Sequence, residues 1–360
     1  MTPNPRRITS LEFKPDFAGA VRRWEAYLAG EIIDRPLVCV TAPKPGMPHV
    51  TPTTYYERVH GSVDEVVDRA LRAAAATYWG GEAIPSFWGS FGCDEVAVFC
   101  GGQFEWKEGA GDTCWSIPFL SDWDRPLPLR LDENHPLWRR MLAMFRKAAE
   151  RMAGKMVMNH IDLHTNMDLL AAARGPQALC LDLLDRPEAI DRAMMSARAV
   201  FPTVWRRIAE AGRMDELGYG GGMFSHEGAA VLQCDFSCMI SPGMFKRWVV
   251  PALEEEAALV RHACYHWDGL GALIHTDAIL ATHGLHTLGF VPGAGHGAQI
   301  EYVDLYKKWQ RAGKAVWVGG SIDEIKRMHR ELDPARTMYS AWTDTPAEAE
   351  QLLEWFVKNT

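Results

Sequence analysis

The segment Tyr265-His266-Trp267-Asp268-Gly269 brings an imidazole, a carboxylate and two aromatic rings to the end of a short apolar run. Side chains alternate along a strand, so His266 and Asp268 should project from the same face. A histidine and a carboxylate side by side suit either ligation of a zinc-like divalent metal or proton transfer. We therefore predict His266 and Asp268 as metal ligands, Tyr265 as a catalytic residue and Trp267 as a substrate-binding residue. The alternative is structural, with Asp268 only orienting His266.

Residues 233–238 form a second polar segment at the end of an apolar run, directly before a predicted helix start. Asp235 is predicted to be a catalytic residue, either as a general acid–base or by orienting the substrate, and Gln233 is predicted to contact the substrate. Cys234 and Cys238 have a Cys-x₃-Cys spacing, which is a weak metal signal. Two buried thiols are the alternative for this pair.

Residues 159–164 form a third such segment. A strand would place His160, Asp162 and His164 on one face, and a helix would also bring the two histidines together. Either arrangement could hold a metal. We predict His164 as a catalytic residue and Asp162 as a substrate-binding residue. In the structural alternative, Asp162 caps a helix expected at 167–174.

His275 follows the turn at Gly269 closely, and we predict that it reaches back to the site as a catalytic residue. A position on a surface helix is the alternative. The chain also has 14 tryptophans, several of them in its first third. Most should serve packing, while some could line a pocket for an apolar or quaternary-ammonium group.

The elements that must position these residues alternate between short apolar runs and helical patterns. Strands that alternate with helices predict parallel βαβ units, and eight such runs predict a closed (β/α)₈ TIM barrel. A doubly wound open sheet is the alternative, but no Gly-x-Gly-x-x-Gly follows any predicted strand. In a TIM barrel the active site lies at the carboxyl ends of the strands. The predicted strands are 37–41, 155–159, 216–220, 230–236, 263–267, 286–291, 314–319 and 337–341.

The first third of the chain has a less regular pattern. Helices are expected at 14–29 and 63–77, and a hairpin is expected to join 95–100 to 103–106. We therefore predict one domain over 1–360. Residues 1–150 would form an elaborated N-terminal cap with the first strand, and 151–360 the main barrel repeats, with helices at 188–210 and 243–262 bending near Pro251.

Composition excludes several classes of function. The net charge of -8 carries no basic footprint, which disfavours nucleic-acid binding. No apolar run is long enough to span a membrane, and the first residues lack a signal-peptide pattern. The eight cysteines are scattered without a Cys-x-x-Cys pair, as expected for free thiols in the cytoplasm. We expect a small-molecule substrate, and the helix at 243–262 could support a homodimer.

The residues just described carry a family resemblance. Between 230 and 297 the sequence resembles the uroporphyrinogen decarboxylase superfamily, which includes the corrinoid-dependent methyltransferases. The similarity is strongest at 233–245, 265–269, 275–280 and 290–295. Within the superfamily, the chain looks most like a branch labelled as trimethylamine corrinoid proteins. The resemblance implies a TIM barrel, and it suggests a small methylated substrate and a corrinoid protein as partner.

The sequence differs from this family at residues that bind the metal or the substrate. Its zinc methyltransferases carry His-x-Cys where this chain has His266-Trp267-Asp268, and a further Cys near where this chain has Gly320-Ser321. An Asp ligand would make a harder metal site, which disfavours thiol methylation by the usual route. The arginine-rich motif of the decarboxylase is missing around 36–46, where a tetrapyrrole with many carboxylates would need it.

Three hypotheses follow from the sequence. The first is a methyltransferase-like enzyme that demethylates a small methylated compound, with zinc or another divalent metal and with a corrinoid protein as partner. The second is a metal-independent decarboxylase or lyase that acts on a small carboxylate through Asp235. The third is a non-catalytic protein that binds a corrinoid or a methylated amine.

Overall fold

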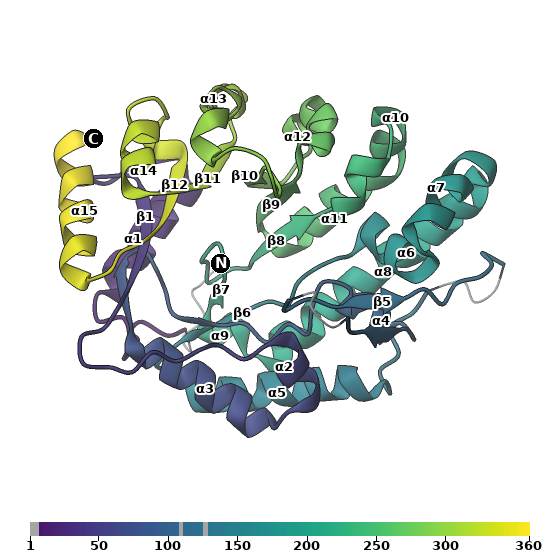
Figure 1. Ribbon diagram of the computed structural model, residues 1–360, viewed down its shortest axis with the longest axis horizontal. Helices are drawn as coiled ribbons and strands as arrows, with labels where there is room; N and C mark the ends of the chain where they lie inside the picture. Colours follow the sequence, from purple (N-terminus) through teal and green to yellow (C-terminus); the bar gives the residue numbers. More distant parts are fainter. Residues whose placement is uncertain (1–6, 108–110, 125–128) are drawn as a thin grey trace.

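The computed structural model describes residues 7–107, 111–124 and 129–360 of the chain. Its largest element is a seven-stranded sheet, in which every neighbouring pair is parallel except β1 with β2. The strands follow an arc (Figure 1). Their order is β2 (Thr77–Gly81), β1 (Leu37–Pro43), β12 (Thr337–Trp342), β11 (Ala315–Gly319), β10 (Leu285–Val291), β9 (His262–Asp268) and β8 (Ala229–Gln233).

A smaller parallel sheet continues the arrangement. It contains β3 (Ser86–Phe87), β6 (Val157–Asn159) and β7 (Tyr219–Gly220) in that order. The predicted α/β fold with a mostly parallel sheet is thus confirmed. Within the described ranges no hydrogen-bonded ladder joins the two parallel sheets, so strand pairing does not demonstrate the closed TIM barrel that the sequence predicted.

All eight apolar runs predicted as strands are strands in the structure. They succeed as predictions because both faces of a parallel sheet are covered, so its strands appear as short continuous apolar segments. Leu232, Cys264, Leu288 and Val316 show the pattern, since each is buried in the middle of its strand. Among the strands that pair in parallel, β3 was missed, because it has only two residues and therefore no pattern to detect.

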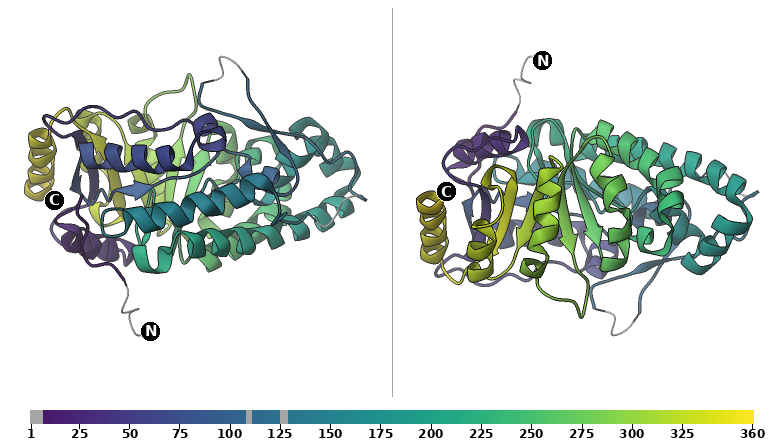
Figure 2. Two further views of the ribbon diagram at one scale, coloured as in Figure 1. Left: turned by 90° about the horizontal axis from the view of Figure 1, so that it is seen from below. Right: turned by 90° about the horizontal axis from the view of Figure 1, so that it is seen from above.

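Helices cover the outer sides of both sheets. In Figure 1 the helices α12 to α15 lie along the outer side of the seven-stranded sheet, and α3 and α5 lie on the opposite side of the molecule. Figure 2 shows α15 and the segment around α7 at opposite ends. The main helices are α1 (Phe17–Leu28), α3 (Val63–Ala76), α5 (Pro136–Met152), α6 (Asn166–Arg174), α7 (Pro176–Asp185), α8 (Pro187–Ala211), α12 (Thr276–Ala281), α13 (Val303–Arg311), α14 (Ile322–His329) and α15 (Pro346–Asn359).

The helix predicted over 243–262 is interrupted. It consists of α10 (Pro242–Met244), a π-helical turn (Phe245–Val249) and α11 (Val250–Val260). Pro251 has no N–H to donate to the preceding turn, and its ring displaces the carbonyl that would normally accept there. The wider π turn in front of the proline accommodates this missing hydrogen bond.

The hairpin predicted for 95–100 and 103–106 is wrong. The first segment is the helix α4 (Glu95–Phe99), and β4 (Gln103–Glu105) pairs instead with β5 (Trp115–Ile117). All five residues of α4 are buried, so the apolar run carries no period that distinguishes strand from helix. The Glu95 carboxylate fixes the helix start, because it accepts hydrogen bonds from Phe91 N at 2.7 Å and Ser90 Oγ at 2.8 Å.

Candidate functional site

A cavity of about 500 Å³ opens beyond the carboxyl ends of β6 and β8. Its polar lining comes from the loop before α4, the antiparallel pair β4–β5, the segment after β6, the helix α6 and the 3₁₀ turn Asp235–Met239. Trp115 and Phe236 provide aromatic walls. We call this the acidic cavity, because its polar lining includes Asp94, Asp168 and Asp235. The position matches the rule that functional sites in parallel α/β folds lie at the carboxyl ends of strands.

His164 lies at the centre of the carboxylates. Its Nδ1 is 3.9 Å from Asp94 Oδ1, and its Nε2 is 3.7 Å from both Asp162 Oδ1 and Asp235 Oδ2. The imidazole is 11 % exposed, so these charges interact with little screening by water. The sequence predicted His164, Asp162 and Asp235 as site residues, and the structure brings all three together.

The charges around His164 change its protonation. Burial by itself would lower the pKa of the imidazole, because the charged form loses its hydration. The surrounding carboxylates of Asp162, Asp168, Asp235 and Asp94 outweigh that effect, and the pKa of His164 is raised. The cluster therefore favours a positive charge at its centre.

Asp168, on the first turn of α6, fixes the loop that carries Asp235. Its two carboxylate oxygens accept hydrogen bonds from Asp235 N at 2.9 Å and Phe236 N at 2.8 Å. Asp168 is only 4 % exposed, and burial raises its pKa to about 6 even though His164 opposes the shift. Asp168 thus positions the general acid–base candidate Asp235.

Cys93 and Asp94 reach the cavity from the loop between β3 and α4. Asp94 accepts a hydrogen bond from Ser116 N at 2.9 Å, and burial raises the pKa of its carboxyl. Burial also raises the pKa of the Cys93 thiol to about 12, with further contributions from Asp162 and Asp94. Cys93, Asp162 and His164 each offer one donor atom, and these three atoms all lie within 4.8 Å of one another.

Gln233, predicted as a substrate-binding residue, holds Asp162 in place. Its Nε2 donates a hydrogen bond to Asp162 Oδ1, and its side chain is nearly buried. The structural alternative for Asp162, a helix cap, does not occur, because Thr165 is the residue in front of α6. Asp235 is satisfied less completely, since its Oδ1 is buried without a hydrogen-bond partner.

A second layer of polar groups supports α6. The buried Glu256 accepts hydrogen bonds from Thr165 Oγ1 at 2.7 Å and from Asn166 Nδ2, which also donates to Gln233 O at 3.0 Å. Burial raises the pKa of Glu256 to about 8. Asn166 has a φ of 45°, in the left-handed region that asparagine tolerates better than most residues. This network fixes the turn that leads from His164 into α6.

The β9 end lies beside this cluster without completing it. His266 and Asp268 are both half-buried and alternate with buried neighbours, as the predicted same-face arrangement requires. Burial raises the pKa of Asp268, and the nearby charge of Asp235 adds to the shift. In the described part of the chain, however, no third donor joins this predicted metal pair in a cluster tight enough for one ion.

Tyr265 and Trp267 do not line the acidic cavity. Both are 1 % exposed, and Trp267 stacks on Trp309 of α13 with ring centroids 4.9 Å apart. The alternation that puts His266 and Asp268 on the inner face puts their neighbours on the helix-covered face. The structure thus places Tyr265 and Trp267 in the packing layer rather than at the predicted catalytic and substrate-binding positions.

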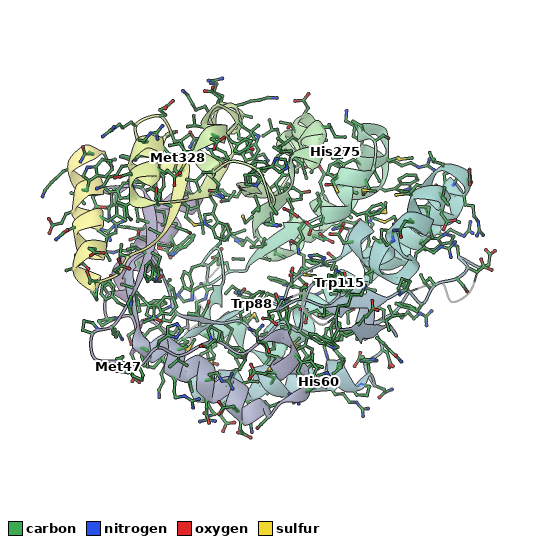
Figure 3. The ribbon with its side chains drawn as sticks, viewed as in Figure 1. Met47, His60, Trp88, Trp115, His275 and Met328 are labelled. Carbon is green, nitrogen blue, oxygen red and sulfur yellow. The ribbon has the colours of Figure 1, made fainter. Side chains whose placement is uncertain are left out.

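His275 is also separated from the acidic cavity. It stacks on Phe245 with centroids 4.2 Å apart, and its Nε2 lies 2.8 Å from Ser237 O. Figure 3 shows His275 on the outer side of the sheet, apart from Trp115. His160 is likewise separate, because it stacks on Trp205 and its pKa is lowered to about 4 by burial. Neither histidine takes part in the cluster around His164.

Cys93, Asp94 and Asp168 are the cavity residues that sequence reasoning missed. The loop with Cys93 and Asp94 follows β3, which is too short to be recognised as a strand. Asp168 sits inside a helical pattern, where an acidic first-turn residue is expected for helix stability alone. The one usable signal was the Cys-Asp-Glu triplet at 93–95, directly before a run of apolar residues.

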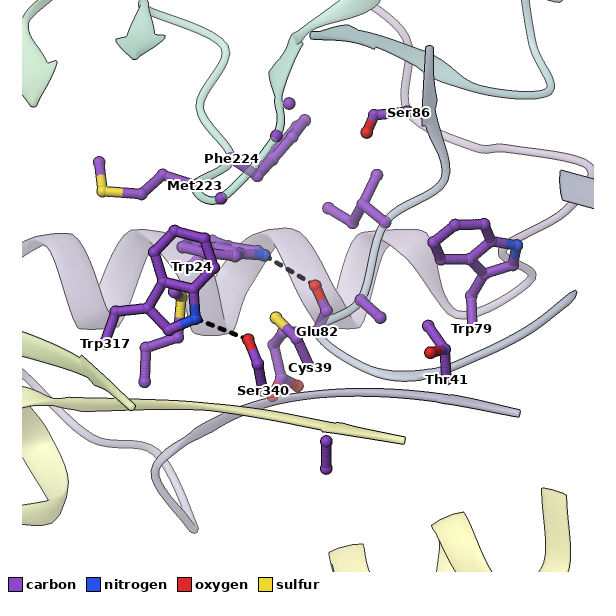
Figure 4. A pocket seen from close by; sticks show the side chains of 17 residues that line it. Trp24, Cys39, Thr41, Trp79, Glu82, Ser86, Met223, Phe224, Trp317 and Ser340 are labelled. Carbon is purple, nitrogen blue, oxygen red and sulfur yellow. Dashed lines mark hydrogen bonds between the residues drawn. The ribbon is translucent and has the colours of Figure 1, made fainter. Parts of the chain in front are cut away.

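A second cavity, of about 270 Å³, lies between β1, β11, β12 and the segment 220–224. We call it the aromatic cavity, because Trp24, Trp79, Phe224 and Trp317 line it (Figure 4). Its polar groups are paired internally, for example Trp317 Nε1 with Ser340 Oγ at 2.7 Å.

Comparison with known proteins supports the fold. No protein-family model matches the sequence, and no curated protein matches it. Among solved structures, a methyltransferase from Methanosarcina mazei is similar, with a TM-score of 0.60 and 13 % sequence identity. The similarity covers 94 % of this chain and 98 % of that chain, so the two share an overall fold over nearly their whole length. Among the residues that the structure describes, no helix combines the length and apolar character needed to cross a membrane.

Proposed function

We propose that this chain is a methyltransferase-like enzyme that removes a methyl group from a small, positively charged methylated compound in the acidic cavity. The observation that carries the proposal is the convergence of Asp94, Asp162 and Asp235 on His164. These carboxylates are only partly exposed, and carboxylates gathered in such a place without enough cationic partners favour a cationic ligand. The fold that the chain shares with a methyltransferase is consistent with this chemistry.

The walls of the cavity suit an alkylated cation. Trp115 already accepts one cation on its face, since Lys107 Nζ lies 5.3 Å from its ring centroid. Lys107 is 60 % exposed and can move aside. Indole faces attract ammonium groups, and the methyl groups of such a ligand gain from apolar contact. Trp115 would therefore contact the apolar methyl groups of a methylated amine, and Asp235 would pair with its positive charge.

Asp235 is the residue assigned to position the substrate nitrogen. The Asp235 side chain is 35 % exposed and lines the cavity, and the hydrogen bonds from its loop to Asp168 keep it in place. In the reaction the carbon–nitrogen bond breaks, and the methyl carbon bonds to a nucleophile of the acceptor. The electron pair stays on nitrogen, and the amine leaves uncharged. The choice of a corrinoid carried by a partner protein as acceptor rests on the sequence resemblance.

The same charges disfavour a decarboxylase of small carboxylates. Among the described residues that line the acidic cavity, Lys107 is the one lysine or arginine, and it is paired with Glu105 at 3.4 Å. An anionic substrate would meet several carboxylates, while His164 and Lys107 already face carboxylates of the chain, which costs binding energy. A tetrapyrrole with many carboxylates is disfavoured for the same reason.

The test is a panel of cationic and neutral methylated compounds. Tetramethylammonium and trimethylamine are compared with methanol and dimethyl ether for binding by calorimetry, and for demethylated product with free reduced cobalamin as the acceptor. We expect the cations to bind and to lose a methyl group, and we expect Asp235→Asn to weaken both. Asp277→Asn is the matched control, because Asp277 is 91 % exposed and lies outside the cavity.

Two outcomes would overturn the proposal. Equal binding of neutral and cationic compounds would contradict recognition by the carboxylates. Tight binding of the cations with no demethylated product, under conditions in which the acceptor is methylated by a chemical methyl donor, would identify a binding protein instead.

A further inference from the structure

We infer that Cys93, Asp162 and His164 form a binding site for a divalent transition metal of the zinc class. Their sulfur, oxygen and nitrogen donors all lie within 4.8 Å of one another, so a small inward movement of the side chains would let one ion contact all three. The site differs from the one that the sequence predicted at His266 and Asp268. It does not depend on the proposed methyl transfer, and its test measures the metal directly.

The donor set is chemically selective. A thiolate, a carboxylate and an imidazole are the side chains that bind zinc, whereas calcium and magnesium prefer oxygen ligands alone. Three protein ligands leave a position of a four-coordinate ion open, as in catalytic rather than structural zinc sites. An ion there would act as a Lewis acid on a group bound at the open position.

Two loops from neighbouring strands bring the donors together. Cys93 follows β3, while Asp162 and His164 follow β6, and these strands pair in parallel through Ser86 with Val157 and Phe87 with Met158. The carboxyl ends of parallel neighbours lie at the same edge of the sheet, so the two loops meet there. All three side chains are partly buried at the base of these loops, which limits their freedom to separate.

One donor is held by a hydrogen bond, and a second has a carboxylate beside it. Gln233 Nε2 donates a hydrogen bond to Asp162, and Asp94 Oδ1 lies 3.9 Å from His164 Nδ1. A carboxylate beside one imidazole nitrogen, with the other nitrogen directed at the metal, is the usual outer arrangement at histidine metal sites. The second nitrogen, Nε2, is the one that faces Asp162 at 3.7 Å. Asp94 is itself fixed by Ser116 N at 2.9 Å.

This site would give the metal a thiolate ligand. The zinc methyltransferases that the sequence resembles carry cysteines where this chain has Asp268 and Gly320-Ser321. Here the thiolate would come from Cys93, on a different strand-end loop. A divalent ion bound by a thiolate, a carboxylate and a neutral imidazole carries no net charge. The remaining carboxylates, Asp94, Asp168 and Asp235, would therefore still attract a cationic substrate.

The test is cobalt(II) binding by the full-length, metal-stripped protein. Cobalt substitutes for zinc and gives a charge-transfer absorption when a thiolate binds it. We expect one cobalt ion per chain with that absorption, displaced by zinc. Cys93→Ser should abolish the charge-transfer band, and His164→Gln should weaken binding by more than the about 10- to 100-fold expected for Asp94→Asn. Cys180→Ser and His283→Ala, both outside the cavity, are the matched controls.

Circular dichroism and thermal unfolding show which variants remain folded. If one ligand variant unfolds, the others and Asp94→Asn still decide the question, because each acts on the same ion. A charge-transfer band that survives in Cys93→Ser would overturn the inference. So would cobalt binding that is lost in His266→Ala but retained in His164→Gln, or wild-type protein that binds no cobalt at millimolar concentration.

Discussion

The two cavities differ in how their polar groups are satisfied. In the aromatic cavity the Glu82 carboxylate is paired with Arg35 at 2.6 Å and with Val38 N at 2.9 Å, and the indole N–H groups of Trp24 and Trp317 have acceptors. In the acidic cavity the carboxylates surround one histidine, and Asp235 Oδ1 has no partner. Both cavities contain a thiol, but only Cys93 lies beside a carboxylate and an imidazole within the described residues.

This difference indicates that the polar groups of the aromatic cavity stabilise the fold, whereas those of the acidic cavity serve a function. A buried charge with its partner in place contributes to one folded structure, whereas buried charges of one sign are tolerated where a ligand completes them. We therefore expect substitutions in the acidic cavity to change binding and turnover, and substitutions in the aromatic cavity to change stability. The predictions below test that separation.

The largest effect is expected for His164→Ala. The imidazole lies between Asp94, Asp162 and Asp235, so its loss removes the group that these carboxylates share. We expect turnover to fall by at least about 100-fold, because the loss both disturbs the carboxylates that hold the substrate and removes a proposed metal ligand. Ser340→Ala in the aromatic cavity should leave turnover unchanged. Steady-state kinetics measures turnover in both variants. A similar loss of turnover in the two would contradict the assignment of function to the acidic cavity and stability to the aromatic cavity.

The next effect is on stability, for Arg35→Met. Arg35 and Glu82 are 7 % and 1 % exposed, so the substitution leaves the Glu82 charge buried without its main partner. We expect the free energy of unfolding to fall by about 3–5 kcal/mol, measured by urea denaturation. Arg69→Met, which breaks a surface pair with Glu57, should cost about 0–1 kcal/mol. Equal costs for the two substitutions would show that the buried pair contributes little.

The sequence predicted the fold better than it predicted the site. Eight apolar runs identified eight strands, because burial on both faces leaves a pattern that needs no knowledge of distant contacts. Sheet closure is different, since it depends on which strand edges meet. The segment 95–100 failed as a strand because a uniformly buried run has no period.

Strand ends indicated which polar residues would lie together where the strand itself was recognisable. Asp162, His164, Gln233 and Asp235 follow recognisable strands, and the structure places them together. Cys93 was missed because its loop is brought to His164 by the pairing of β3 with β6. This pairing joins distant parts of the chain and involves only two residues of each strand. His275 was misplaced for another reason: the turn after Gly269 directs its ring onto Phe245, and no local pattern encodes that direction.

Acid should destabilise the protein through histidines outside the acidic cavity. The pKa of His160 is lowered to about 4 by burial, against about 6.5 in the unfolded chain. Between these values only the unfolded chain binds the proton, so stability falls as the pH drops from about 6.5 to 4 and is fully present above that window. We expect His160 to contribute on the order of 3 kcal/mol to this loss.

The variant His160→Phe isolates this contribution. It keeps an aromatic ring on Trp205 but removes the titrating group, so its unfolding free energy should vary less with pH over the same window. Urea denaturation at several pH values measures the slope. His226 and His286, whose pKa values are also lowered to about 4 by burial, should maintain the remaining dependence. An unchanged slope in His160→Phe would contradict the assignment.

The smallest effect is expected for Trp317→Phe, and it tests whether the two cavities are independent. The substitution removes the hydrogen bond from Trp317 Nε1 to Ser340 Oγ and enlarges the aromatic cavity beside Met223. We expect a loss of about 1–2 kcal/mol in the free energy of unfolding. Cobalt affinity and turnover should stay at the wild-type level, because Trp317 lines the aromatic cavity and does not line the acidic one. If turnover fell while stability changed little, the aromatic cavity would belong to the substrate site, and the separation of binding from stability would fail.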